Sequence, residues 1–236
     1  MRLNKGKLKD ALGQLPFLPE VYWRIVYRGR PLSKKASLQS LRKQIPQWKA
    51  EVQSILGDSA FSKNPCQRIV LFSSYKLWLQ HSALLAMALA CLGHSVTLAF
   101  LPFFTWRKRL SNFSVRIQNA YTKSVLANLT PYVKVFSLYQ WAQQAKNGCL
   151  PEPLDCAIQQ VSLRDTQYTL QVERFDPSDL KSESGRLYAL RLERNRLTAR
   201  AALSWLETQI PDVILIPNGS ILEFGAFYQV ARFLNV

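Results

Sequence analysis

An uncharged stretch of 30 residues, 77–106, most constrains what this chain can fold into. The stretch is long enough to cross a lipid bilayer. Its interior, however, has two unlike parts: residues 83–92 are rich in strong helix formers, and residues 96–101 are β-prone. Gly93-His94-Ser95 separates them. A helix, a glycine stop and a buried strand are typical of an α/β fold, so we expect a core helix and a core strand here rather than a transmembrane helix.

The residues before this stretch complete a βαβ unit. Residues 68–74 (RIVLFSS) form a short apolar and β-branched run, which predicts a first strand. A loop over 74–82 enters a helix at about 80–92, and a second strand covers 95–103. Neither strand alternates between apolar and polar residues, so both are expected to be buried on both faces of a parallel sheet.

The rest of the chain continues the alternation of strands and helices. The expected elements are a mostly helical segment over 103–129, a third strand over 132–138, long helices over 151–173 and 186–210, a fourth strand over 211–220, and a final helix. This order predicts an α/β fold with a doubly wound, mostly parallel, Rossmann-like sheet over residues 67–236. Residues 1–66 read as a basic, aromatic-rich helical extension, with the boundary near 61–67.

Charge is unevenly distributed along the 236 residues, whose net charge is +16. Residues 1–66 hold 13 basic and 4 acidic residues, and residues 67–150 hold 9 basic residues and no acidic one. Such a basic region favours an anionic partner: a membrane surface, a phosphorylated ligand or a nucleic acid. The alternative is a basic surface that only water covers.

Cysteine and histidine content argues against a metal site. The four cysteines form no CxxC pair, and the chain has only two histidines, so no zinc site is expected. The N-terminus is basic but lacks the apolar core of a signal peptide. A reducing cytoplasm is therefore the expected compartment.

The loop after the first strand is one candidate site, because ligands of doubly wound sheets bind beyond the carboxyl ends of the strands. It lacks the glycine patterns of a dinucleotide fold and of a P-loop, so NAD binding and ATP hydrolysis lose support. Its hydroxyls and amine, beside a helix N-terminus, suit a phosphate or a sugar. His81 is a candidate base, or alternatively a histidine that only caps or hydrogen-bonds. The candidate ligand-binding residues are Ser73, Ser74, Tyr75 and Lys76.

The loop after the fourth strand is the second candidate. Asn218-Gly219 permits a tight turn, and Ser220 with Glu223 matches a capping box for the next helix. The same four residues also form a polar cluster where a hydroxylated ligand would bind. On the preceding long helix, most of the polar face is expected in water, with Arg194 or Asn195 turned toward the crevice; its arginines include Arg186, Arg191, Arg194 and Arg200.

Two segments interleave aromatic and basic side chains in the way that membrane interfaces favour. The alternatives are stacking on single-stranded nucleic acid, or packing against the domain with the charges in water. The candidate membrane contacts are Tyr22, Trp23 and Arg24 in the first segment, and Phe103, Phe104, Trp106, Arg107, Lys108 and Arg109 in the second.

Two long segments resemble the N-terminal domain of GT-B glycosyltransferases. RIVLFSSYKLWLQHSALLAMALACLGHSVTLAF resembles its opening βαβ unit. RLERNRLTARAALSWLETQIPDVILIPNGSILEFGAFYQVARFLNV resembles its later part, where a helix leads to a "PDV-strand-NG" turn and another helix. The resemblance covers about residues 67–236.

The resemblance implies an acceptor-side half of a glycosyltransferase. In that family the acceptor binds mainly in the N-terminal domain, and the nucleotide-sugar donor binds mainly in a second domain, which nothing here resembles. We therefore expect no cofactor in this domain, no transfer by this chain alone, and a longer natural polypeptide or a partner subunit that supplies the donor domain. By position, Ser74, Tyr75, His81 and residues 218–223 would line the acceptor side of the cleft.

The expected function is transfer of a sugar from a nucleotide-sugar donor to a lipid-linked or polysaccharide acceptor, at the inner face of the cytoplasmic membrane. Membrane-associated members of the family use basic and aromatic surfaces to meet lipid-linked acceptors. Two alternatives remain open at this point. The chain is a basic α/β protein that binds nucleic acid, or it is a non-catalytic, membrane-anchoring subunit of a two-chain transferase.

Overall fold

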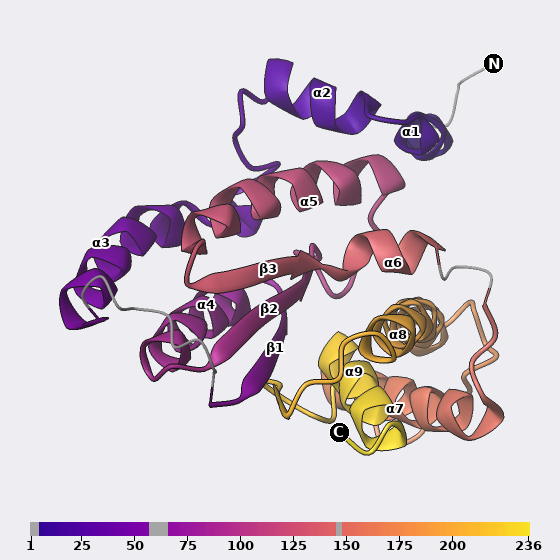
Figure 1. The fold of residues 1–236 in the computed structure, drawn as a ribbon. Helices are drawn as coiled ribbons and strands as arrows, with labels where there is room; N and C mark the ends of the chain where they lie inside the picture. The colour runs from indigo at the N-terminus through magenta and orange to yellow at the C-terminus, as the bar shows by residue number, and fades with distance from the viewer. Residues whose placement is uncertain (1–4, 57–65, 145–147) are drawn as a thin grey trace.

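The computed structural model describes residues 5–56, 66–144 and 148–236, and it contains a parallel four-stranded sheet of order β3-β2-β1-β4. Figure 1 shows the sheet with helices on both of its faces. This architecture confirms the predicted α/β fold with a parallel sheet. The strands are β1 (Arg68–Ser74), β2 (Ser95–Leu101), β3 (Val133–Ser137) and β4 (Val213–Leu215).

Alternate residues of the strands point to two separate cores. Val70, Phe72 and Leu101 belong to a core shared with the helices of the carboxyl-terminal third, whereas Leu71 and Leu98 belong to a core shared with the earlier helices. The period of two places successive side chains on opposite faces, so both faces of β1 and β2 are buried. The first face is covered by α6 (Leu138–Gln144), α7 (Glu152–Leu170), α8 (Glu183–Leu206) and α9 (Leu222–Phe233), and the second by α4 (Lys76–Cys91) and α5 (Asn112–Leu126).

The uncharged stretch 77–106 folds as the core helix α4 and the core strand β2, as its two-part composition predicts. No helix of the described residues is long and apolar enough to cross a bilayer. Two boundaries differ from expectation. The predicted helix over 103–129 begins only at Asn112, after the Ser111 cap, and residues 102–111 form a loop; the predicted strand over 211–220 shortens to β4.

The amino-terminal segment consists of α1 (Lys5–Gln14), α2 (Leu18–Ile25), a short 3-10 turn η1 (Lys34–Ala36) and α3 (Gln39–Leu56). In Figure 1, α1 and α2 lie across the outer side of α5. Polar contacts join the amino-terminal segment to α5. The Tyr121 hydroxyl accepts the Leu38 N–H at 2.8 Å, and Arg116 pairs with Glu20 at 2.6 Å. The expected boundary at 61–67 falls largely outside the described residues.

Candidate functional site

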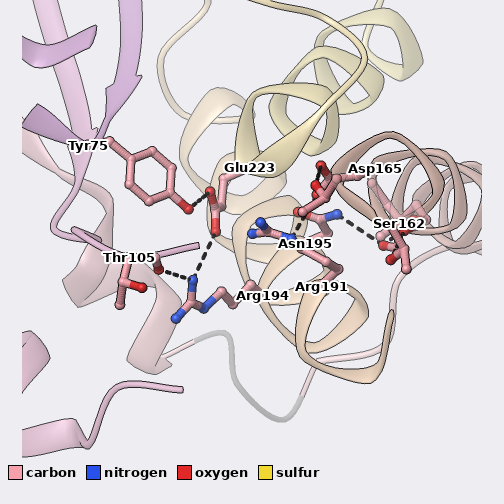
Figure 2. Close-up of polar contacts among 11 residues, drawn as sticks. Tyr75, Thr105, Ser162, Asp165, Arg191, Arg194, Asn195 and Glu223 are labelled. Carbon is pink, nitrogen blue, oxygen red and sulfur yellow. Dashed lines mark hydrogen bonds and ion pairs between the residues drawn. The ribbon is translucent and has the colours of Figure 1, made fainter. Parts of the chain in front are cut away.

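A buried hydrogen bond joins the two loops that the sequence singles out. Tyr75 directly follows β1, and Glu223 lies in the first turn of α9, after β4. The Tyr75 hydroxyl donates to Glu223 Oε2 at 2.6 Å (Figure 2). Because the strand order turns back between β1 and β4, this is the crevice where doubly wound sheets bind ligands. Here both side chains are buried and bonded to each other.

Tyr75 has an unusual backbone conformation and a strongly shifted hydroxyl pKa. Its φ of 59° lies in the left-handed region, which strains a bulky residue by about 1–3 kcal/mol. Burial raises the pKa of its hydroxyl well above the usual value, and the charge of Glu223 raises it further. The hydroxyl therefore stays protonated and remains a donor to the carboxylate.

Arg194 connects this pair to the loop after β2. Its Nη1 lies 3.9 Å from Glu223 Oε1 and donates to the Thr105 carbonyl at 2.7 Å (Figure 2). Its Nη2 donates to the Lys108 carbonyl at 2.6 Å. The guanidinium also lies over the Phe103 ring, 4.8 Å from its centroid. One side chain of α8 thus contacts the 102–111 loop at three residues.

A second buried pair lies beside the first. Arg191 Nε is 2.9 Å from Asp165 Oδ2, and their side chains are 0% and 1% exposed. Burial raises the pKa of Asp165 to about 6; the charge of Arg191 opposes this shift, and the charge of Glu223 adds to it. On the same face of α8, Asn195 donates to the Ser162 hydroxyl at 3.0 Å. These contacts fix α7 against α8.

These positions correct one prediction about α8. Arg191 is not on a solvated face, because it is buried. The expected inward placement of Arg194 or Asn195 is confirmed, since both side chains are buried. A signal for this exists in the sequence. Arg191 follows Leu187 by four residues and Arg194 precedes Ala201 by seven, so the helical period places both on the apolar stripe.

The predicted capping box is also wrong. Ser220 does not cap α9. Its N–H and its hydroxyl both donate to the Asn218 side-chain oxygen, at 2.8 and 2.9 Å. Helix α9 is preceded by Ile221, which makes no side-chain cap. Glu223 turns inward because Tyr75 and Arg194 offer it a donor and a positive charge in a low-dielectric interior. The Tyr228 ring approaches Gly219 closely: an added Cβ would lie 3.2 Å from the ring, so a larger residue here would require the ring to shift.

The other candidate ligand-binding residues lie apart. Ser73 and Ser74 are buried at the end of β1, where Ser74 donates to the Leu101 carbonyl at 3.2 Å. Lys76 and His81 are exposed on α4. His81 lies beside Trp78, on a helix face that also exposes Leu77, Leu84, Leu85 and Leu92. The structure thus brings Tyr75 and Glu223 together, and it leaves His81 away from them.

The aromatic and basic segments are only partly exposed. Trp23 is buried, and its indole N–H donates to the Arg30 carbonyl; Phe103 is buried beneath Arg194. Neither contributes to the outer surface, and Phe104 is half-buried. The candidates that remain exposed are Tyr22, Arg24, Trp106, Arg107, Lys108 and Arg109.

A cavity of about 250 Å³ opens beside the buried network, at the carboxyl ends of β2 and β3. Its apolar walls come from Phe103, Tyr139, Leu190 and Leu197, among others. Sequence reasoning missed this cavity because helix α1 contributes to it from the other end of the chain. Its polar lining consists of Asp10, Gln14, Arg109, Asn112, Gln143, Glu193 and Arg194.

No family model, no curated protein and no solved structure matches this chain. Among the described residues, no three His, Cys, Asp or Glu side chains are grouped as a metal ion would require. What the structure establishes is an α/β domain with a parallel sheet of order β3-β2-β1-β4.

Removing the Tyr75 hydroxyl tests the buried network. We expect Tyr75→Phe to lower the unfolding free energy by about 1–3 kcal/mol, because Glu223 stays buried without its donor. Urea denaturation measures the change. Tyr168→Phe is the matched control: its side chain is 65% exposed, and its loss should stay within about 0.5 kcal/mol. Equal effects of the two substitutions would contradict the network.

Asp165 predicts a pH dependence. Its folded-state pKa of about 6 lies above the usual 3.8, so ionisation costs folding free energy as pH rises from about 4 through about 6. Asp165→Asn cannot ionise. Its unfolding free energy relative to the wild type should therefore increase by up to about 3 kcal/mol across that range. Denaturation curves at several pH values measure this difference, and a flat difference would refute the raised pKa.

Proposed function

We propose that this chain is the acceptor-side half of a glycosyltransferase, which in its complete form transfers a sugar from a nucleotide-sugar donor to a lipid-linked or polysaccharide acceptor. The observation that carries the proposal is the lining of the cavity at the carboxyl ends of β2 and β3. The resemblance to GT-B acceptor domains supports it. The donor site would lie in a second domain or a partner subunit.

The chemistry of the cavity suits a sugar ring. Hydroxyl groups pair well with planar carboxylate, amide and guanidinium groups, and such groups make up about half of its lining residues. The apolar walls offer surface for the C–H face of a ring. At about 250 Å³, the cavity is smaller than the ~300–1,000 Å³ of pockets for drug-sized ligands. One sugar unit at a time is therefore the expected occupant.

A base for the acceptor hydroxyl is expected among the carboxylates of the cavity. His81 does not line the cavity, so it is a poor candidate for this role. Asp10 accepts the Asn112 N–H at 3.0 Å, and Glu193 pairs with Arg109 at 2.7 Å. Both side chains of the Arg109–Glu193 pair are more than half exposed, so the pair is weak and can open to a ligand.

The buried network would support this site without touching the sugar. Tyr75 and Glu223, proposed from the sequence as acceptor contacts, hold Arg194 in place, and Arg194 both lines the cavity and positions the loop after β2. Their proposed role therefore becomes one of positioning. Lys76 and the Asn218–Ser220 turn lie outside the cavity lining.

We propose an anionic membrane surface as the place where the acceptor is met. The outer side of α2 exposes Phe17, Val21 and Ile25 at spacings of four residues, with Arg24 and Arg28 beside them. The only acidic residue of α2, Glu20, turns inward to Arg116. The outer surface is therefore apolar and basic, a combination that binds anionic lipid.

Filling the cavity tests sugar binding. For any methyl glycoside that the wild type binds, we expect Leu190→Trp to weaken binding by about tenfold or more, because the indole occupies the space of the sugar ring. Saturation-transfer NMR against a panel of methyl hexopyranosides measures it. The control is Leu84→Trp on the exposed face of α4, which should bind like the wild type. A panel that the wild type does not bind would contradict the proposal.

Membrane binding has its own test. Ile25→Glu should lower binding to phosphatidylglycerol vesicles by about tenfold, since it places a carboxylate on the apolar side of α2. Co-sedimentation measures it, with Leu84→Glu as the control for an exposed leucine elsewhere. Equal losses would argue against α2 as the contact. Steeply salt-dependent binding to single-stranded oligonucleotides, with none to vesicles, would favour the nucleic-acid alternative.

A further inference from the structure

A second cavity adjoins the 250 Å³ cavity, the proposed sugar pocket. It measures about 440 Å³ and shares Arg109, Leu190 and Glu193 with the first. Away from the shared residues, Arg107 and Arg186 line it. The two cavities are therefore adjacent, and we refer to them together as the groove. The larger cavity is lined by three arginines, Arg107, Arg109 and Arg186.

The arginines at the outer end keep their charge. Arg107 donates to the Thr169 carbonyl at 3.3 Å, and Arg186 donates to the Lys181 carbonyl. Neither forms an ion pair with any residue in the described part of the chain. A carbonyl oxygen orients a guanidinium without neutralising it. Both groups are therefore available to an anion.

The larger cavity is lined by more basic than acidic side chains, three arginines against two glutamates. Glu193 is paired with Arg109, and Glu183 faces the groove from the first turn of α8. Against them stand Arg107, Arg109 and Arg186, together with the positive end of the α8 dipole. Guanidinium groups bind phosphate through two parallel hydrogen bonds, which makes phosphate the anion that this arrangement fits best.

We infer that the acceptor is a phosphate-linked sugar, with its ring in the smaller cavity and its phosphate between Arg107, Arg109 and Arg186. This inference rests on the proposed function and adds the chemical class of the acceptor. The shared residues explain the geometry: Arg109 lies at the junction, so it can contact the phosphate while Glu193 binds a hydroxyl of the ring. A polysaccharide acceptor without phosphate would leave the three arginines without a role.

The test compares sugars with and without phosphate. The probes are the 1-phosphates of glucose, galactose and mannose, the matching methyl glycosides, and inorganic pyrophosphate, titrated by NMR. We expect at least one 1-phosphate to bind about tenfold tighter than its glycoside. The double variant Arg107→Gln/Arg186→Gln should lose this tenfold and keep glycoside binding. The control Arg24→Gln/Arg28→Gln removes the same charge from α2 and the turn after it and should change neither.

The outcomes separate this inference from the proposed function. If the phosphate adds no affinity, or if both double variants lose the same amount, the phosphate site is refuted while glycoside binding still supports the sugar pocket. If pyrophosphate binds through Arg107 and Arg186 but no glycoside binds, the proposed function fails and the phosphate site stands. If these arginines are needed for phosphatidylglycerol vesicles and bind no soluble phosphate, the groove takes lipid headgroups and the inference is overturned.

Discussion

The buried guanidinium of Arg194 is the interaction on which the candidate site depends. It sits near the charge of Glu223 and donates to the carbonyls of Thr105 and Lys108. Helix α8, the start of α9 and the loop after β2 therefore meet at one cation. Breaking a buried ion pair from one side costs about 3–5 kcal/mol, because the remaining charge is left unpaired. The geometry of the cavity is thus tied to the stability of the core.

This network also explains where the cavity lies. The crevice between β1 and β4 is the usual ligand site of a doubly wound sheet, but here Tyr75 and Glu223 are buried there and bonded to each other. The cavity lies instead at the carboxyl ends of β2 and β3, where Phe103 and Tyr139 form part of its wall and α1 contributes Asp10. The amino-terminal segment therefore completes the candidate site as well as packing against α5.

Local patterns predict the sheet well and the site poorly, for a physical reason. The strands β1 and β2 and the helix α4 follow from runs of apolar residues and from one glycine stop. These signals depend only on residues that are close together in the sequence. The role of Glu223 depends on Tyr75, 148 positions away, and no local rule contains that partner. The capping box failed for this reason: a weaker local contact competed with a buried, charge-assisted one.

The uneven charge of the sequence has a structural counterpart. From Ser59 to Pro151 the chain has no acidic residue, so a side-chain carboxylate that pairs with a basic residue of this segment must come from another part of the chain. Arg68 pairs with Asp212, Arg109 with Glu193 and Arg116 with Glu20. These pairs draw distant segments onto the acid-free middle of the chain and neutralise part of its charge. Other basic side chains, including Arg107 beside the groove, have no carboxylate in these pairs. They form the part of the basic surface that can attract an anionic ligand.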